Sequence, residues 1–203
     1  HSNTVPEMKH GVKLKDAGWK DRNGEHKKEL IVVGELKQVT DLINENEKLT
    51  KKTKDYFDEN YAGWWNKILA EDMNADGKID LVIGNLGENS QCRASNKEPA
   101  EMYYKDFDGN GTIDPVLCFY IQWKRYPFLS KDEMLSQVNG MEQKIRYYKD
   151  YAVAGIKDLL TEDKWKGYHH LQSNELATCY LYSSYDDRFK QDNLKQDTKI
   201  SPA

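Results

Sequence analysis

Two nine-residue stretches of the chain carry oxygen-bearing side chains at the same four positions, 1, 3, 5 and 9. The first covers residues 72–80 and the second covers residues 106–114. Calcium is a hard cation that takes six to eight oxygen ligands at about 2.3–2.6 Å, and alternate residues of a curled loop converge on one ion. The spacing therefore predicts one calcium ion in each loop, with these side-chain ligands: Asp72, Asn74, Asp76 and Asp80 in the first loop, and Asp106, Asp108, Asn110 and Asp114 in the second.

The residues between these ligands support the same interpretation. Position 6 is Gly77 in the first loop and Gly111 in the second, and glycine tolerates the sharp bend that folds a chain around a metal. Position 7, Lys78 or Thr112, is expected to offer its backbone carbonyl whatever its side chain is. The aspartate at position 9 is expected to close the shell with both of its oxygens.

The EF-hand is the obvious alternative, and it fails at position 12. An EF-hand loop needs a glutamate there and a helix on either side. Position 12 is Ile83 in the first loop and Leu117 in the second, and both lie in apolar, β-branched runs. The loops are therefore expected to lead into strands. A ligand set made of oxygen alone also gives no reason to expect zinc or a redox metal.

A third stretch repeats the pattern in degenerate form. Asp21, Asn23, Glu25 and Glu29 occupy positions 1, 3, 5 and 9, but position 6 is His26. Because the required glycine is missing, no third ion is expected, although these four residues remain a possible degenerate site.

The elements that must position these loops read mainly as β-strands. Each of the three stretches runs into a short β-branched segment, and the pattern recurs every 35–50 residues or so, which is typical of blades, a solenoid or an array. Residues 36–53 fit a helix or a strand, and we favour a hairpin that turns near Asn44 and returns through Leu49. A further strand is expected at 176–184, with a polar turn at 185–188 before Phe189.

Residues 130–160 change character. Ser130 and Glu133 form a capping-box pattern, and apolar residues then follow at helical spacing, with an interruption at Gly140. The segment is interpreted as a helical insertion, either a packed cap or a lid for a partner or ligand. The expected organisation is β blades with calcium loops over 12–128, the insertion over 129–171 and a closing hairpin over 172–192.

Composition limits the function classes. The net charge is −4, from 30 basic and 34 acidic residues, whereas a nucleic-acid footprint is usually basic and clustered. No apolar run is long enough for a membrane span, and no signal peptide is visible. Three widely spaced cysteines predict buried thiols or a single disulfide with one thiol left over: Cys92, Cys118 and Cys179.

Few residues suggest catalysis. No nucleophile elbow, metalloprotease helix or phosphate loop is present. His169 and His170, with Glu175 nearby, are acid–base candidates, but adjacent histidines more often lie in a solvated loop. Aromatic side chains could stack on sugar rings, or they could pack between neighbouring sheets: Trp64, Trp65 and Trp123. No catalytic residue is predicted.

The segment 63–68 (GWWNKI), the first loop, the segment 80–87 (DLVIGNLG) and the second loop together resemble FG-GAP/VCBS repeats. These are β-propeller blade repeats like those of integrin α-subunits, and the similarity is greatest to exported VCBS or UnbV-type proteins of Bacteroidetes-type bacteria. The resemblance is strong over 63–128 and weaker over 21–53 and 175–190. It implies four-stranded blades, calcium between outer strands and a periplasmic, cell-surface or extracellular location.

The fold class expected is thus mainly β, with propeller-type blades and an α-helical insertion. Three blades are too few to close a propeller of four to eight, so a partial propeller or a fragment is expected. The function expected is binding or adhesion to a protein or glycan partner at the cell exterior, with two calcium ions as structural braces. The alternatives are a calcium-dependent polysaccharide hydrolase or lyase, and a purely architectural segment of a larger propeller protein.

Overall fold

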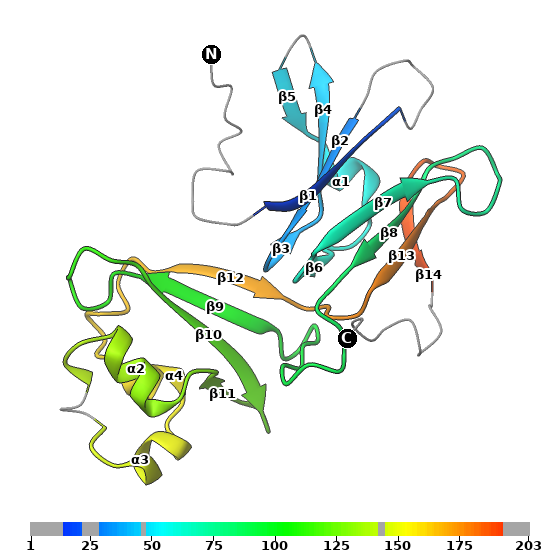
Figure 1. Cartoon of the computed structure of the whole chain (residues 1–203). Helices are drawn as coiled ribbons and strands as arrows, with labels where there is room; N and C mark the ends of the chain where they lie inside the picture. Colours follow the sequence, from blue (N-terminus) through cyan, green and yellow to red (C-terminus); the bar gives the residue numbers. More distant parts are fainter. Residues whose placement is uncertain (1–13, 22–28, 46–47, 142–144, 193–203) are drawn as a thin grey trace. The chain divides into compact units, whose positions relative to one another are not determined.

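The computed structural model describes residues 14–21, 29–45, 48–141 and 145–192 (Figure 1). The chain divides into two compact units. Unit 1 contains residues 1–91 and 173–203, and unit 2 contains residues 92–172. Unit 2 is therefore inserted, in sequence, between two parts of unit 1. None of the helices in the described ranges is long and apolar enough to cross a membrane.

Unit 1 contains two four-stranded antiparallel sheets. The first has the order β1-β2-β4-β5, with bounds β1 Leu14–Lys20, β2 Glu29–Gly34, β4 Thr40–Glu45 and β5 Lys48–Lys51. The second has the order β14-β13-β8-β7, with bounds β7 Lys67–Glu71, β8 Asp80–Gly84, β13 Cys179–Ser183 and β14 Phe189–Asp192. A short pair, β3 (Lys37–Gln38) and β6 (Ala62–Gly63), and the one-turn helix α1 (Thr53–Tyr56) complete this unit within the described residues.

The core of unit 1 lies between these two sheets. Ile31 and Val33 of β2 pack in one cluster with Leu81 and Ile83 of β8. Because side chains alternate along a strand, the intervening residues of β2 face the other way and pack against β4 and β5. Every residue of β2 is consequently buried, which explains why its sequence is a continuous apolar run after Glu29.

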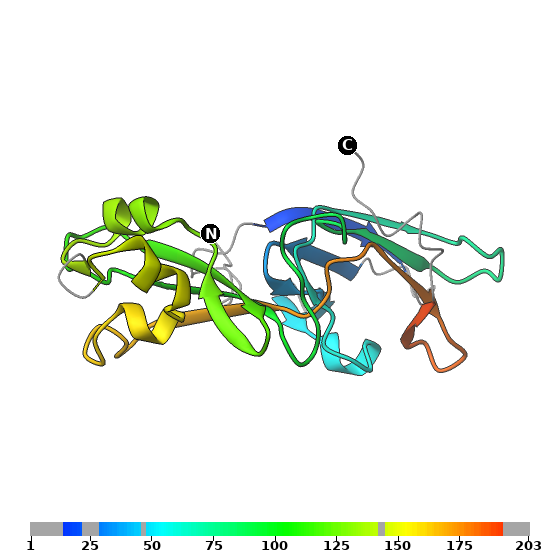
Figure 2. The same cartoon turned by 90° about the horizontal axis from the view of Figure 1, so that it is seen from below.

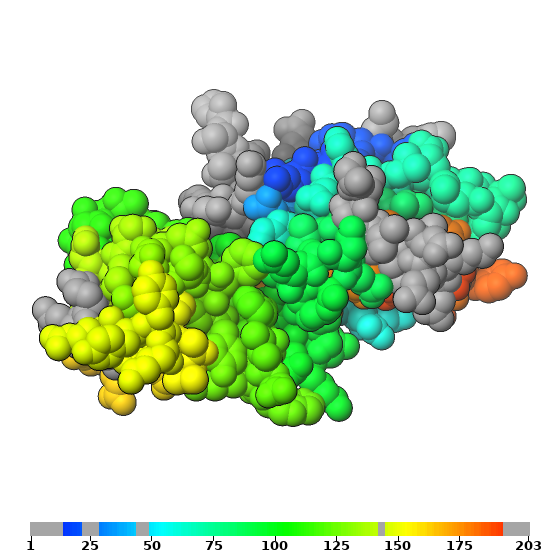
Figure 3. All heavy atoms as spheres, turned by 60° about the horizontal axis from the view of Figure 1, so that its bottom comes forward, coloured from blue at the N-terminus to red at the C-terminus, as the bar shows by residue number. Residues whose placement is uncertain are grey.

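Unit 2 combines one sheet with three short helices (Figure 2). The sheet has the order β11-β10-β9-β12, with bounds β9 Ala100–Lys105, β10 Asp114–Ile121, β11 Lys124–Pro127 and β12 His169–Ser173. The helices are α2 Lys131–Gln137, α3 Tyr148–Val153 and α4 Ile156–Leu159. Met134 of α2 and Ile156 and Leu159 of α4 share a core with Val116 and Cys118 of β10. Figure 3 shows the surface of these helical residues, yellow-green to yellow, beside the green surface of the strands.

The three acidic stretches occupy equivalent places in the three large sheets. Each joins two neighbouring antiparallel strands, namely β1 to β2, β7 to β8 and β9 to β10. In each case the residue just before position 1 pairs with the residue at position 9: Lys20 with Glu29, Glu71 with Asp80, and Lys105 with Asp114. The internal repeat seen in the sequence is therefore also a repeat of strand register.

Several sequence predictions are confirmed at the level of local structure. The chosen hairpin is present as β4 paired with β5, and the last hairpin is present as β13 paired with β14. The capping box of Ser130 and Glu133 begins α2, and Gly140 has a φ of 85° after that helix ends. The mainly β class is confirmed, whereas the assembly of these sheets into propeller blades stays a prediction.

The expected division of the chain differs from the compact units. The predicted boundaries at 128/129 and 171/172 set the helical segment apart, whereas unit 2 groups residues 92–128 with it. The reason is packing: the apolar faces of α2 and α4 are buried against β10, so helices and strands share one core.

Candidate metal loops

Loop 1, residues 72–80, is curled by hydrogen bonds from its own backbone. Both oxygens of the Asp72 carboxylate accept backbone N–H groups, Oδ1 from Asp76 at 3.1 Å and Oδ2 from Gly77 at 2.9 Å. Asp76 Oδ1 in turn accepts from the backbone of Lys78 at 2.8 Å. Ala75 and Gly77 have φ angles of 61° and 85°, so the chain bends sharply at the residues flanking Asp76.

Loop 2, residues 106–114, has nearly the same internal bonding. Asp106 accepts the backbone N–H groups of Asn110 at 3.0 Å and Gly111 at 2.8 Å, which correspond in position to the two donors of loop 1. Gly109 and Gly111 take the positive φ angles here, 79° and 87°. The shared spacing of the two sequences therefore produces the same turn twice.

The loops differ in how their carboxylates lie. In loop 2, ligand oxygens of Asp106, Asp108 and Asp114 all lie within 4.8 Å of one another. Within the described residues, this is the one such group of three or more acidic, histidine or cysteine side chains. Asp114 is buried, and burial followed by the charges of Asp108 and Asp106 raises the pKa of its carboxyl, although a hydrogen bond from Phe107 opposes the shift. A cation at this point would offset that repulsion.

In loop 1 the equivalent carboxylate is held by the neighbouring strand. Asp80 is fully buried, and its Oδ2 accepts the Tyr180 hydroxyl at 2.7 Å while its Oδ1 accepts the backbone N–H of Ser183 at 3.0 Å. Met73 N also donates to Oδ2 at 3.3 Å, as Phe107 N does to Asp114. Asp80 therefore already has three donors, two of them from β13.

The surroundings of the loops also differ in charge. Lys78 Nζ donates to Ser184 O at 2.9 Å and pairs with Asp187 at 3.0 Å. A hollow of about 530 Å³ beside loop 1 is lined by Asn74, Asp76, Lys78 and Lys190, among others. In loop 2, position 7 is the uncharged Thr112, and Asp108 accepts two hydrogen bonds from Asn139, through its backbone N at 3.0 Å and its Nδ2 at 2.7 Å.

The degenerate third stretch is described only in part. Asp21 and Glu29 are described, and Glu29 is buried at the start of β2. Asn23 and Glu25 lie outside the described residues.

The three tryptophans of interest lie in different surroundings. Trp65 is fully buried and its Nε1 donates to Tyr61 O at 3.3 Å, so its ring is not available for stacking on a ligand. Trp64 is partly buried, and its backbone N donates to Asn85 at 3.0 Å. Trp123 is 78% exposed in the turn between β10 and β11.

The histidine pair and Glu175 each have partners of their own within their units. His170 Nε2 lies 3.0 Å from Oε1 of Glu101, a residue 69 positions earlier in the chain. Glu175 belongs to unit 1, and its carboxylate accepts the backbone N–H of Ala177 at 2.8 Å. His169 stacks on the Tyr104 ring with centroids 5.1 Å apart.

The three cysteines are buried thiols and form no disulfide, as one of the two sequence readings expected. Sequence reasoning missed Tyr180, Ser183 and Asn139, the residues that contact the loop carboxylates from outside. Their separations from those carboxylates are 100, 103 and 31 residues, so no local spacing could have indicated them.

Comparisons of this chain with family models, with curated proteins and with solved structures gave no match.

Proposed function

We propose that this chain is a calcium-binding module of an exported or surface protein, in which calcium braces β-hairpins and the module acts in binding or adhesion. The observation that carries the proposal is the convergence of Asp106, Asp108 and Asp114 at the end of a hairpin. Loop 1 repeats that spacing and turn, so it is proposed as a second, weaker site. We propose no catalytic role for either loop.

Calcium suits these loops better than other common metals. The available donors are carboxylate, amide and backbone carbonyl oxygens, which hard cations prefer, whereas zinc favours nitrogen and sulfur. Magnesium demands near-octahedral geometry and keeps several waters, whereas calcium tolerates irregular, oxygen-rich loops. In loop 2 the proposed side-chain ligands are Asp106, Asp108, Asn110 and Asp114, with the Thr112 carbonyl.

A bound ion would act as a brace because each loop joins paired strands at their ends. At millimolar calcium and a dissociation constant near 10⁻⁴ M, one ion stabilises the folded state by about 1.4 kcal/mol. This is a useful share of the free energy of unfolding of a typical protein, about 5–15 kcal/mol.

Calorimetric titration of demetallated protein with calcium chloride tests the proposal, with magnesium chloride as the ion control. Calcium should bind with a dissociation constant on the order of 10⁻⁴ M or tighter, and magnesium should bind more weakly. Asp106→Asn should remove the tighter of the two calcium-binding events, which is assigned to loop 2. The matched control is Asp163→Asn, which changes a carboxylate that is 86% exposed and lies outside both loops. Absence of calcium binding, or an equal loss of calcium affinity in Asp106→Asn and Asp163→Asn, would contradict the proposal.

A further inference from the structure

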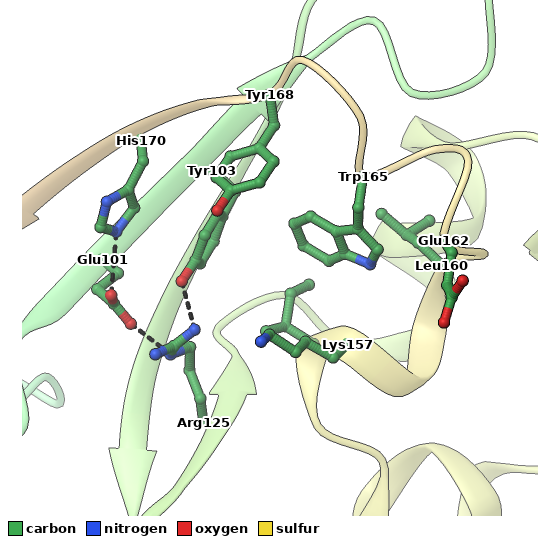
Figure 4. A pocket seen from close by; sticks show the side chains of 10 residues that line it. Glu101, Tyr103, Arg125, Lys157, Leu160, Glu162, Trp165, Tyr168 and His170 are labelled. Atoms are coloured by element: carbon green, nitrogen blue, oxygen red, sulfur yellow. Dashed lines mark hydrogen bonds and ion pairs between the residues drawn. The ribbon is translucent and has the colours of Figure 1, made fainter.

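Unit 2 contains a hollow of about 630 Å³ that no metal ligand lines (Figure 4). It lies where β9, β11 and β12 face α4 and the segment that follows that helix. Its volume is within the roughly 300–1,000 Å³ typical of small-molecule sites. The lining residues are Glu101, Tyr103, Arg125, Ile156, Lys157, Leu160, Glu162, Trp165, Tyr168 and His170.

Arg125 organises one side of this hollow. Its guanidinium forms an ion pair with the buried carboxylate of Glu101, donates to the Tyr103 hydroxyl, and donates from Nη2 to the Tyr120 hydroxyl at 2.6 Å. His170 completes the group from the other side of Glu101. Because Arg125 and Glu101 neutralise each other, this partly buried cluster presents fixed polar groups without a net charge.

Aromatic rings form another part of the lining. The Trp165 ring lies nearly perpendicular to those of Tyr103 and Tyr168, with centroids 5.3 Å and 5.5 Å away. Figure 4 shows these rings along one side, with the side chains of Arg125 and Lys157 below them. The Trp165 Nε1 atom is buried and has no acceptor within the described part of the chain. Because this N–H is closed to solvent, ligand hydrogen bonds are expected at polar groups that solvent reaches, such as Lys157 and Glu162.

The formal charges that line the hollow cancel. Glu101 and Glu162 supply two negative charges, and Arg125 and Lys157 supply two positive charges. A site for a phosphate or a carboxylate would show an excess of positive charge. The balance favours an uncharged ligand that can both donate and accept hydrogen bonds.

A second hollow of about 350 Å³ shares Arg125, Ile156 and Lys157 with the first. It adds one positive and one negative charge, from Lys124 and Asp158, so the balance is kept. Its lining includes Trp123, a residue that is 78% exposed. The two hollows, which share three lining residues, are together called the unit 2 groove below.

We propose that the unit 2 groove binds a neutral oligosaccharide. Sugar rings offer apolar C–H faces that stack on aromatic rings and hydroxyl groups that both donate and accept hydrogen bonds, and the groove presents partners for both. Tyr168 and Trp123 are the exposed stacking surfaces, and Lys157 and Glu162 are polar groups at the rim. This inference goes beyond the proposed calcium role and stands without the ion.

Two contacts connect the groove to loop 2 and to the residue before it. Phe107, at position 2 of the loop, packs against Trp165 with centroids 5.6 Å apart, and Lys105 Nζ donates to the Lys166 carbonyl at 2.6 Å. An ion in loop 2 would therefore hold the residues that carry the Trp165 ring. This coupling rests on the proposed function, whereas sugar binding in chelator does not.

The test is isothermal titration of the full chain with neutral tetrasaccharides built of glucose, mannose, galactose or xylose, and with a tetra-uronate as the charged counterpart. Titrations are run in chelator and in calcium. At least one neutral tetrasaccharide should bind with a dissociation constant below about 1 mM, and more tightly than the tetra-uronate. Tyr168→Ala and Trp123→Ala should each weaken it about tenfold, consistent with loss of one stacking contact.

The controls are exposed aromatic residues that line neither hollow, replaced in Tyr147→Ala and Trp19→Ala, which are 56% and 52% exposed in the native chain. These variants should bind as the native protein does. Lack of binding by every neutral probe up to on the order of 10 mM, tighter binding of the tetra-uronate, or equal losses in the groove and control variants would overturn the proposal. Calcium titration of the same samples is read separately, so failure of the ion site is distinguished from failure of the groove.

Discussion

Loops 1 and 2 share ligand spacing, internal hydrogen bonds and strand register, yet they place their last carboxylate differently. Asp114 lies with Asp106 and Asp108 in one acidic cluster, whereas Asp80 is bonded to Tyr180 and Ser183 of the next strand. Sequence spacing is therefore enough to set the turn. The neighbours of the position-9 carboxylate decide whether its oxygens are left for a metal or are used by the protein.

The second difference is what each loop touches. Loop 1 is tied by Lys78 to the turn between β13 and β14, so its contacts are structural. Loop 2 contacts Trp165, which lines the unit 2 groove. We infer that loop 1 depends for its stability mainly on hydrogen bonds within the chain. Loop 2 depends more on a bound ion.

The largest expected effect comes from Asp80→Ala. It leaves the Tyr180 hydroxyl and the backbone N–H groups of Ser183 and Met73 without their buried acceptor, so the free energy of unfolding should fall by about 3 kcal/mol. The loss should be similar in calcium and in excess chelator, as measured by urea unfolding under both conditions. If the free energy of unfolding fell only in the presence of calcium, Asp80 would act mainly as a metal ligand, as proposed for Asp114.

Asp114→Ala should act through the ion. We expect it to abolish the stabilisation that the loop 2 ion supplies, about 1.4 kcal/mol at millimolar calcium. In chelator the effect should be smaller, because removing this carboxylate also removes its repulsion with Asp106 and Asp108. Thermal unfolding with and without calcium measures the difference, with Asp163→Ala as the control for loss of an exposed carboxylate. Equal destabilisation in both conditions would show a packing role instead.

An alkaline pH effect is expected on the loop 1 side. Partial burial, and then the hydrogen bond to Asp80, raise the pKa of Tyr180 from 10 to about 12. Between these values the unfolded chain loses the proton and the folded chain keeps it, so the free energy of unfolding should fall as the pH rises from 10 to 12. Tyr180→Phe should reduce this slope, as followed by urea unfolding across that range. An unchanged slope would show that other tyrosines cause it.

The smallest effect is expected from Lys78→Met. Only the backbone carbonyl at this position is a proposed ligand, so calcium affinity should not fall. Loss of the partly exposed ion pair with Asp187 should cost less than about 1 kcal/mol. Calorimetry and urea unfolding measure the two quantities. A large drop in calcium affinity would show that the side chain takes part in the site, contrary to the proposed ligand set.

Much of the β framework follows from local patterns. An apolar run follows position 9 of each of the three acidic stretches, and these runs predicted β2, β8 and β10. The Ser130–Glu133 pair predicted the start of α2. The grouping of the helices with β9–β11 did not follow, because it depends on a core formed by distant residues such as Met134 and Val116. The partners of Asp80 and the Glu101–Arg125–His170 cluster were missed for the same reason: each joins residues that are tens of positions apart in the sequence.

The measurement that compares the loops most directly is a calcium titration followed by ¹⁵N NMR. It is read at the backbone amides of Gly77 and Gly111, which donate to equivalent oxygens of Asp72 and Asp106. Both amide signals should shift on addition of calcium, and the Gly111 signal should reach its midpoint at the lower concentration. If neither signal moves, or if Gly77 responds first, the proposed difference between the two loops is contradicted.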